Sequence, residues 1–164
     1  MINRRHVSSL LACSLILGLA LLAAGCGGQD QAPAATSDTA SAPPALQRSP
    51  APPGATVFII SPTDGATVTS PVSVKFGISG ISVAPAGQNT PNTGHHHLLI
   101  DTELANPDAP VPADPQHVHY GKGQTETSIE LEPGQHTLQL VLGDGNHVPH
   151  QPPIVSKVVT ITVE

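Results

Sequence analysis

The sequence predicts an all-β domain, an immunoglobulin-like antiparallel β-sandwich of about seven strands. Three observations predict it. Apolar and polar residues alternate with a period of two, clusters of Gly, Pro and Asn separate the alternating runs, and nothing after the first 25 residues shows helical periodicity. The chain has 164 residues, which suffices for one domain of ordinary size. A small antiparallel barrel is the alternative arrangement of the same strands.

Residues 1–25 have the pattern of an export signal. Two arginines near the start supply positive charge, and residues 10–24 form an apolar run too short to span a bilayer comfortably. The run ends in Leu22-Ala23-Ala24-Gly25-Cys26, where small residues precede a single cysteine. This resembles the bacterial lipobox, and it predicts that Cys26 becomes the lipidated first residue of the mature protein. The alternative is an ordinary cleaved signal peptide with an incidental cysteine.

The next segment, residues 26–53, is predicted to be the lipidated cysteine followed by a disordered linker. It is rich in Ala, Pro, Ser, Thr and Gln, and it has too few large apolar residues to offset its ordering entropy. The β-sandwich domain is then expected over residues 54–164. These features together predict an exported lipoprotein of the bacterial cell envelope that faces the periplasm, with the outer membrane as the expected site of anchoring.

The strands are expected where short alternating or β-branched runs lie between turn clusters. Val72, Val74 and Phe76, for example, alternate with polar or small residues, which is typical of a half-buried strand. In the last run the alternation would turn Lys157 inward, so we expect a β-bulge near Ser156. The expected strands are residues 56–60, 72–79, 96–101, a short one before 120, 124–131, 136–142 and 154–163.

The composition excludes several classes of function. The chain has 12 acidic and 6 basic residues, and export would remove two of the basic ones, so we expect no nucleic-acid binding. A lipid on Cys26 is therefore the expected attachment to a membrane. Cys13 lies inside the export signal and Met1 is the sole methionine, so a copper(I) site built on Cys or Met is excluded from the domain.

Seven histidines are expected to gather at one end of the sandwich as metal ligands. Consecutive antiparallel strands place alternate loops at the same end, and these histidines fall in or beside three such connections. His136 begins a strand at the opposite end and is excluded. The candidate ligands are His95, His96, His97, His117, His119, His147 and His150.

The local spacing of these residues supports the same hypothesis. Residues i and i+2 of a strand face the same way, roughly 6.6 Å apart, so His95 with His97 can converge on one ion. His117 with His119 repeats this spacing. Imidazole is mostly neutral near pH 7 and suits Cu(II) or Zn(II), so one of these ions is the expected cofactor.

Two qualifications come from the same residues. The parity of the following leucines places His96 on the core side of its strand, where it would be a hydrogen-bonded core residue and not a ligand. The histidines as a group could instead anchor loops or form a pH-responsive cluster. If a metal is bound, Asp101, Glu126 and Asp144 are the candidates to orient the ring N–H groups.

Four motifs resemble a family of short exported bacterial domains that are rich in histidine and catalogued as a domain of unknown function. They are HHHLLID from His95, HVHYGKGQTE from His117, LEPGQHTLQL from Leu131, and GDGNHVPH from Gly143. Tyr120 stands where the family is expected to have Phe. The resemblance covers roughly residues 70–164 and implies export, but it implies no activity. A segment from Ser61 to Pro71 is also similar to the opening strands of bacterial immunoglobulin-like modules.

The first functional hypothesis is a lipid-anchored, extracytoplasmic protein that binds Cu(II) or Zn(II) for metal handling, with a metal-handling protein as its partner. The second is a metal-dependent enzyme at the same histidines, with Glu126 as acid or base; the sequence favours binding over catalysis because it has no G-x-S-x-G elbow, cysteine nucleophile or phosphate-binding loop. The third is a metal-free adhesion or assembly module that uses the same loops.

Overall fold

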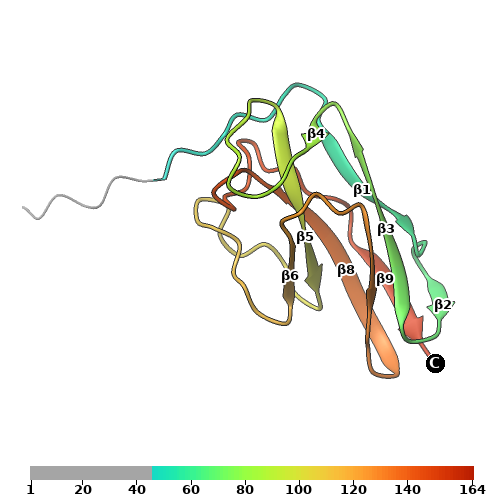
Figure 1. Ribbon diagram of the computed structural model, residues 1–164. Coiled ribbons are helices and arrows are strands. Elements are labelled where there is room, and N and C mark those ends of the chain that lie inside the picture. Colours follow the sequence, from blue (N-terminus) through green and yellow to red (C-terminus); the bar gives the residue numbers. More distant parts are fainter. Residues whose placement is uncertain (1–45) are drawn as a thin grey trace, which may run out of the picture. The chain divides into compact units, whose positions relative to one another are not determined.

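The structure is a computed structural model that describes residues 46–164 (Figure 1). The predicted export signal, the lipidated Cys26 and the linker up to residue 45 lie outside the described residues. No helix within residues 46–164 is long and apolar enough to cross a membrane.

One of the two sheets in residues 46–164 has three strands. Its order is β1 (Thr56–Ser61), β3 (Val72–Ser79) and β7 (Glu126–Ile129), and both pairings are antiparallel. The predicted strands at 56–60 and 72–79 correspond closely to β1 and β3. The predicted strand at 124–131 is shorter in the structure, where β7 covers its central four residues.

The other sheet has six strands. The main path runs β2 (Ala66–Val68), β9 (Val159–Val163), β8 (Gly134–Gly143), β5 (Thr93–Ile100) and β4 (Ser82–Val83). The short strand β6 (His117–Tyr120) also pairs with β5. In Figure 1 the β5, β8 and β9 ribbons run side by side, and β1 and β3 form the other layer.

The predicted all-β sandwich is therefore confirmed. The sequence did not indicate β2 and β4, because runs of three and two residues are too short to show alternation. Both are paired in parallel, β2 with β9 and β4 with β5, so the sandwich is not purely antiparallel.

The main core lies between the two sheets and follows the alternation of the sequence. Val72, Val74 and Phe76 of β3 meet Leu98 of β5 and the leucines of β8, and each of these side chains is at most 4% exposed. A second, smaller cluster covers the outer face of the six-stranded sheet and is made of Leu99, Val111 and Val141. Strand β5 is thus buried on both faces, which explains why almost every residue of this strand is inaccessible to water.

The β-bulge predicted near Ser156 is present. Val141 opposes Val155, whereas Leu138 opposes Val159, so the register of the two strands changes by one residue between these pairs. The Ser156 hydroxyl accepts a hydrogen bond from the amide of Leu140 at 2.9 Å. It thereby takes the place of a backbone carbonyl in the hydrogen bonding between the two strands. Lys157 is exposed as a result, and alternate residues of β9 return to the core.

Backbone pairing in the structure extends to residues before the predicted start of the domain at residue 54. The composition predicts that residues 48–51 belong to a disordered linker, but Pro50 forms a parallel bridge with Gln151. The Ala51 amide donates to the Gln151 carbonyl at 2.9 Å, and the Gln151 amide donates to the Ser49 carbonyl at 2.9 Å. Composition could not show this, because the segment is held mainly by backbone pairing and polar contacts, with Ala51 as its one residue packed against the core.

Candidate metal site

The candidate site is built on the outer face of the six-stranded sheet, where β5 and β6 run side by side. His95 and His97 alternate with His96 along β5, so both point to this outer face, and both are almost fully buried at 0% and 1% exposure. His97 lies directly opposite His119 in the antiparallel register of β5 and β6. Two neighbouring strands thus bring three imidazole rings together.

The fourth imidazole comes from the loop between β8 and β9. Nδ1 of His147 lies 3.1 Å from Nε2 of His95, and the ring centroids of His119 and His147 are 4.7 Å apart. One possible ligand nitrogen from each of the four residues lies within 4.8 Å of all the others. We call His95, His97, His119 and His147 the four-histidine cluster.

Two glycines leave the space that the rings occupy. A Cβ atom on Gly143 would lie 2.7 Å from Cε1 of His97, and a Cβ atom on Gly121 would lie 2.3 Å from Cε1 of His119. Both distances are far below van der Waals contact, so any larger residue would displace the rings. Neither glycine could be recognised from the sequence as part of a site, since a glycine in or beside a strand usually indicates only a turn or a bulge.

Burial and mutual proximity favour the uncharged form of three histidines of the cluster, His95, His97 and His119. Burial, with the nearby His95, His119 and His147, lowers the pKa of His97 from 6.5 to about 2. Burial, followed by the neighbouring His147 and His119, lowers the pKa of His95 to about 4, although Asp144 opposes the shift. The pKa of His119 is also lowered, by burial and by His147. Neutral rings at pH 7 have free lone pairs, which metal coordination requires.

The cluster contains buried nitrogen atoms without a hydrogen-bond partner. Nδ1 of His95 and Nδ1 of His97 are both inaccessible, and neither has a partner among the described residues. Buried polar atoms are normally paired, because an unpaired one costs about 1–3 kcal/mol. A set of converging and incompletely paired imidazoles, three of which have lowered pKa values, is compatible with metal binding.

The other three predicted ligands do not join this cluster. His96 points into the sandwich, as the parity of β5 predicts, where its ring centroid is 5.1 Å from that of Phe76. His117 pairs with Asp114 through Nδ1 at 2.8 Å. Both ring nitrogens of His150 lie 3.2 Å from backbone carbonyl oxygens, so neither points into the cluster.

Of the three carboxylates expected to orient the rings, Asp144 alone serves the cluster, and it does so through the backbone. Its Oδ1 accepts hydrogen bonds from the amides of Asn146 at 2.9 Å and Val148 at 3.1 Å, on either side of His147. Its carbonyl also accepts a hydrogen bond from the His147 amide at 2.9 Å. Asp144 therefore shapes the loop, whereas the predicted role was to bind a ring N–H.

The two remaining carboxylates lie elsewhere. Asp101 binds His136 through Oδ2 at 2.6 Å and the Thr137 amide through Oδ1 at 2.8 Å. Glu126 is exposed at the start of β7, in the three-stranded sheet. Neither can orient a ring of the cluster, and Glu126 is not placed to act there as an acid or base.

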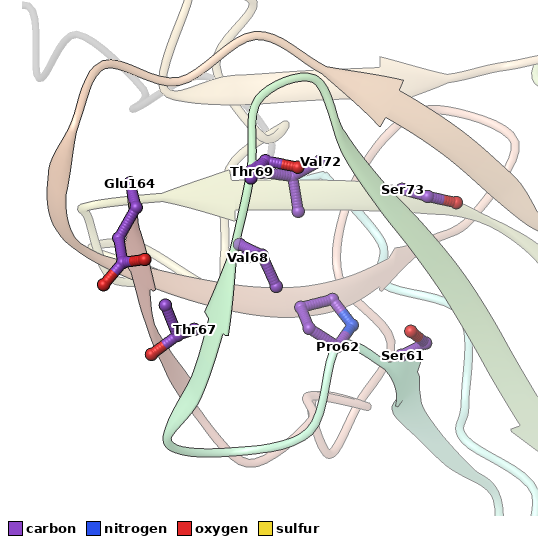
Figure 2. A pocket seen from close by; sticks show the side chains of 8 residues that line it. All are labelled: Ser61, Pro62, Thr67, Val68, Thr69, Val72, Ser73 and Glu164. Carbon is purple, nitrogen blue, oxygen red and sulfur yellow. The ribbon is translucent and has the colours of Figure 1, made fainter.

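A separate cavity lies near the far end of β8. Figure 2 shows it, with Ser61, Thr67, Ser73 and the carboxylate of Glu164 around it, and its volume is about 480 Å³. Val163 opposes Gly134 at the start of β8, whereas His95 opposes Gly143 at its end, so this cavity and the cluster lie at opposite ends of that strand. Its lining offers one carboxylate and small hydroxyls, which is a poor set of metal ligands.

Residues 74–164 match the family described as "Domain of unknown function (DUF4399)", and the chain belongs to this family. The predicted resemblance to a domain of unknown function is thereby confirmed. The search of curated proteins gave no match. Among solved structures, the chain is similar to fibronectin(III)-like modules of Clostridium thermocellum CbhA, with 13% sequence identity and a TM-score of 0.31 over 65% of this chain and 92% of that one.

Proposed function

We propose that this domain binds one divalent transition-metal ion, Cu(II) or Zn(II), through His95, His97, His119 and His147. The observation that carries the proposal is the convergence of four imidazoles from three separate segments within 4.8 Å. Zn–N bonds of 2.0–2.1 Å place tetrahedral ligand nitrogens about 3.3 Å apart, so small ring movements would complete such a site.

The chemistry of the cluster supports this class of ion. All four groups are imidazoles, which suit Zn(II), Cu(II) and Ni(II), whereas Mg(II) and Ca(II) prefer oxygen ligands. Four protein ligands would fill a tetrahedral coordination sphere, which is typical of binding sites and not of catalytic ones. We therefore favour metal handling or storage over catalysis.

The cellular setting is part of the same proposal. The pattern of residues 1–25 and the lipobox-like sequence at Cys26 support export and a lipid anchor in the cell envelope. A domain held at a membrane surface would be placed to exchange its ion with a metal-handling partner in the periplasm.

The test is calorimetric titration of the full chain, purified in detergent and stripped with a chelator, with Zn(II), Cu(II) and Mg(II) in separate runs. We expect about one Zn(II) or Cu(II) per chain and no saturable Mg(II) binding. His119→Gln should weaken binding by more than the roughly 10- to 100-fold that loss of an outer-shell partner costs.

The matched control is His117→Gln, which changes the other histidine of the same short strand and should leave affinity unchanged. The proposal fails if the unmodified chain shows no saturable binding below the millimolar range. It also fails if His119→Gln and His117→Gln bind as well as the unmodified chain does.

A further inference from the structure

The chain segment before β1 lies along the loop that supplies His147. The backbones of residues 49–51 pair with Gln151 through two hydrogen bonds of 2.9 Å, on the C-terminal side of that loop. The loop itself spans the short distance between the end of β8 at Gly143 and this pairing. An antiparallel bridge between Gly143 and Pro149 closes the base of the loop, and the preceding segment pairs with the chain just beyond that bridge, at Gln151.

Arg48 holds the same stretch through its guanidinium group. Its Nε donates to the Pro149 carbonyl at 2.9 Å, and Nη2 donates to the carbonyl of His150. Nη1 reaches the exposed carboxylate of Asp108 at 2.7 Å. The Arg48 side chain is 9% exposed, so these contacts are made by a nearly buried group that fits three acceptors at once.

Ser49 reaches the other end of the loop. Its hydroxyl donates to Oδ2 of Asp144 at 2.9 Å, and its amide lies 3.3 Å from the same oxygen. The second oxygen of Asp144 accepts from the amides that flank His147. A continuous chain of hydrogen bonds thus runs from Ser49 through Asp144 to the backbone beside the metal-site histidine.

His147 needs such support because of its backbone conformation. Its φ is 65°, in the left-handed region that residues other than glycine rarely adopt because it is strained. In this conformation its Nδ1 comes to 3.1 Å from Nε2 of His95. Release of the loop would allow His147 to return to a commoner conformation and would move its ring.

We propose that Arg48 and Ser49 are positioning residues of the metal site, which hold the β8–β9 loop so that His147 completes the four-histidine cluster. This rests on the proposed function. The segment that sequence composition assigns to a linker is then part of the metal site. Because coupling between sites is reciprocal, bound metal must also stabilise the docking of this segment.

The test measures Zn(II) affinity of the full chain by competition with a chromophoric chelator. Arg48→Ala and Ser49→Ala should each weaken binding by about 10-fold, as loss of an outer-shell partner does. Leu46→Ala is the matched control, because Leu46 belongs to the same segment and is 53% exposed. It should change affinity by less than about 2-fold.

A double-mutant cycle separates positioning from a general loss of structure. In a His147→Gln background, Arg48→Ala should have no further effect on the remaining Zn(II) affinity, because its action passes through His147. Equal weakening by Arg48→Ala in both backgrounds would overturn the proposal. So would an Arg48→Ala variant that binds Zn(II) as tightly as the unmodified chain does.

Hydrogen exchange supplies a second readout. Zn(II) should slow exchange at the amides of Ala51 and Gln151 in the unmodified chain, and this protection should be lost in His147→Gln. Absence of Zn(II) binding by the unmodified chain would refute the proposed function. Tight binding without protection at these amides would refute only the positioning role.

Discussion

His97 and His136 lie on β5 and β8 of the same sheet, yet their pKa values move in opposite directions. Burial and neighbouring imidazoles lower the pKa of His97, whereas a hydrogen bond to Asp101, together with one to the Glu132 carbonyl, raises the pKa of His136. The comparison shows that the partners of a histidine decide its role. Imidazoles grouped without a carboxylate stay neutral and can bind a metal, while a carboxylate converts a histidine into an ion-pair partner.

The largest expected effect is acid sensitivity of the metal-free protein. His95 and His97 have lower pKa values folded than unfolded, so the unfolded chain takes up protons first as the pH falls below 6.5. Stability should therefore fall with pH, by up to about 1.4 kcal/mol per pH unit for each residue. Urea unfolding between pH 7 and pH 4.5 measures this slope.

His97→Gln should make that slope clearly shallower, because the substituted residue does not titrate. His136→Gln is the control and should leave the slope below about pH 6 unchanged, because the contribution of His136 varies with pH only above about pH 6.5. A slope that is the same in His97→Gln and in the unmodified chain would contradict the assignment of acid sensitivity to the cluster.

A metal ion should stabilise the fold by mass action. With free Zn(II) at 100 times the dissociation constant, the free energy of unfolding should rise by about 2.7 kcal/mol. A domain of this size should then melt roughly 10 °C higher in a thermal scan. His147→Gln should lose most of this gain and His136→Gln none of it; an equal gain in both variants would place the ion outside the cluster.

A smaller effect is expected when space beside a ring is filled. Gly121→Ala would put a methyl group within 2.3 Å of the His119 ring and force the ring aside. Zn(II) affinity should fall by about 10-fold, while the melting temperature of the metal-free protein changes little because His119 is exposed, so its ring can shift into solvent. Chelator competition and a thermal scan test this; unchanged affinity would show that His119 is not a ligand.

The smallest effect should come from His136. The hydrogen bond to Asp101 raises the pKa of His136 in the folded protein. The stabilisation that protonated His136 provides is therefore fully present below pH 6.5 and is lost as the pH rises through the pKa of the folded state. Asp101 is 41% exposed, so solvent screening keeps the contribution below about 1 kcal/mol. The free energies of unfolding of His136→Gln and the unmodified chain should differ more at pH 5.5 than at pH 8.5; a constant difference would indicate packing and not charge.

Much of the fold could be predicted because strand alternation is local. The side chains of Val72 and Val74 face one way, and the parity that turns His96 inward also turns His95 and His97 outward. The bulge near Ser156 followed from the same rule, since an inward lysine would be costly. Very short paired strands such as β4 escaped prediction, because partners distant in the sequence define them.

The sequence by itself determined the longer strands, their buried faces and the set of seven histidines from which a site could be made. Only the tertiary structure decided which of them meet. Cross-strand register brings His119 and not His117 opposite His97. The left-handed backbone conformation of His147 turns its ring toward the cluster, whereas hydrogen bonds to backbone carbonyls hold the His150 ring elsewhere. These choices depend on register and loop closure, which join residues far apart in the chain, whereas alternation depends only on neighbours.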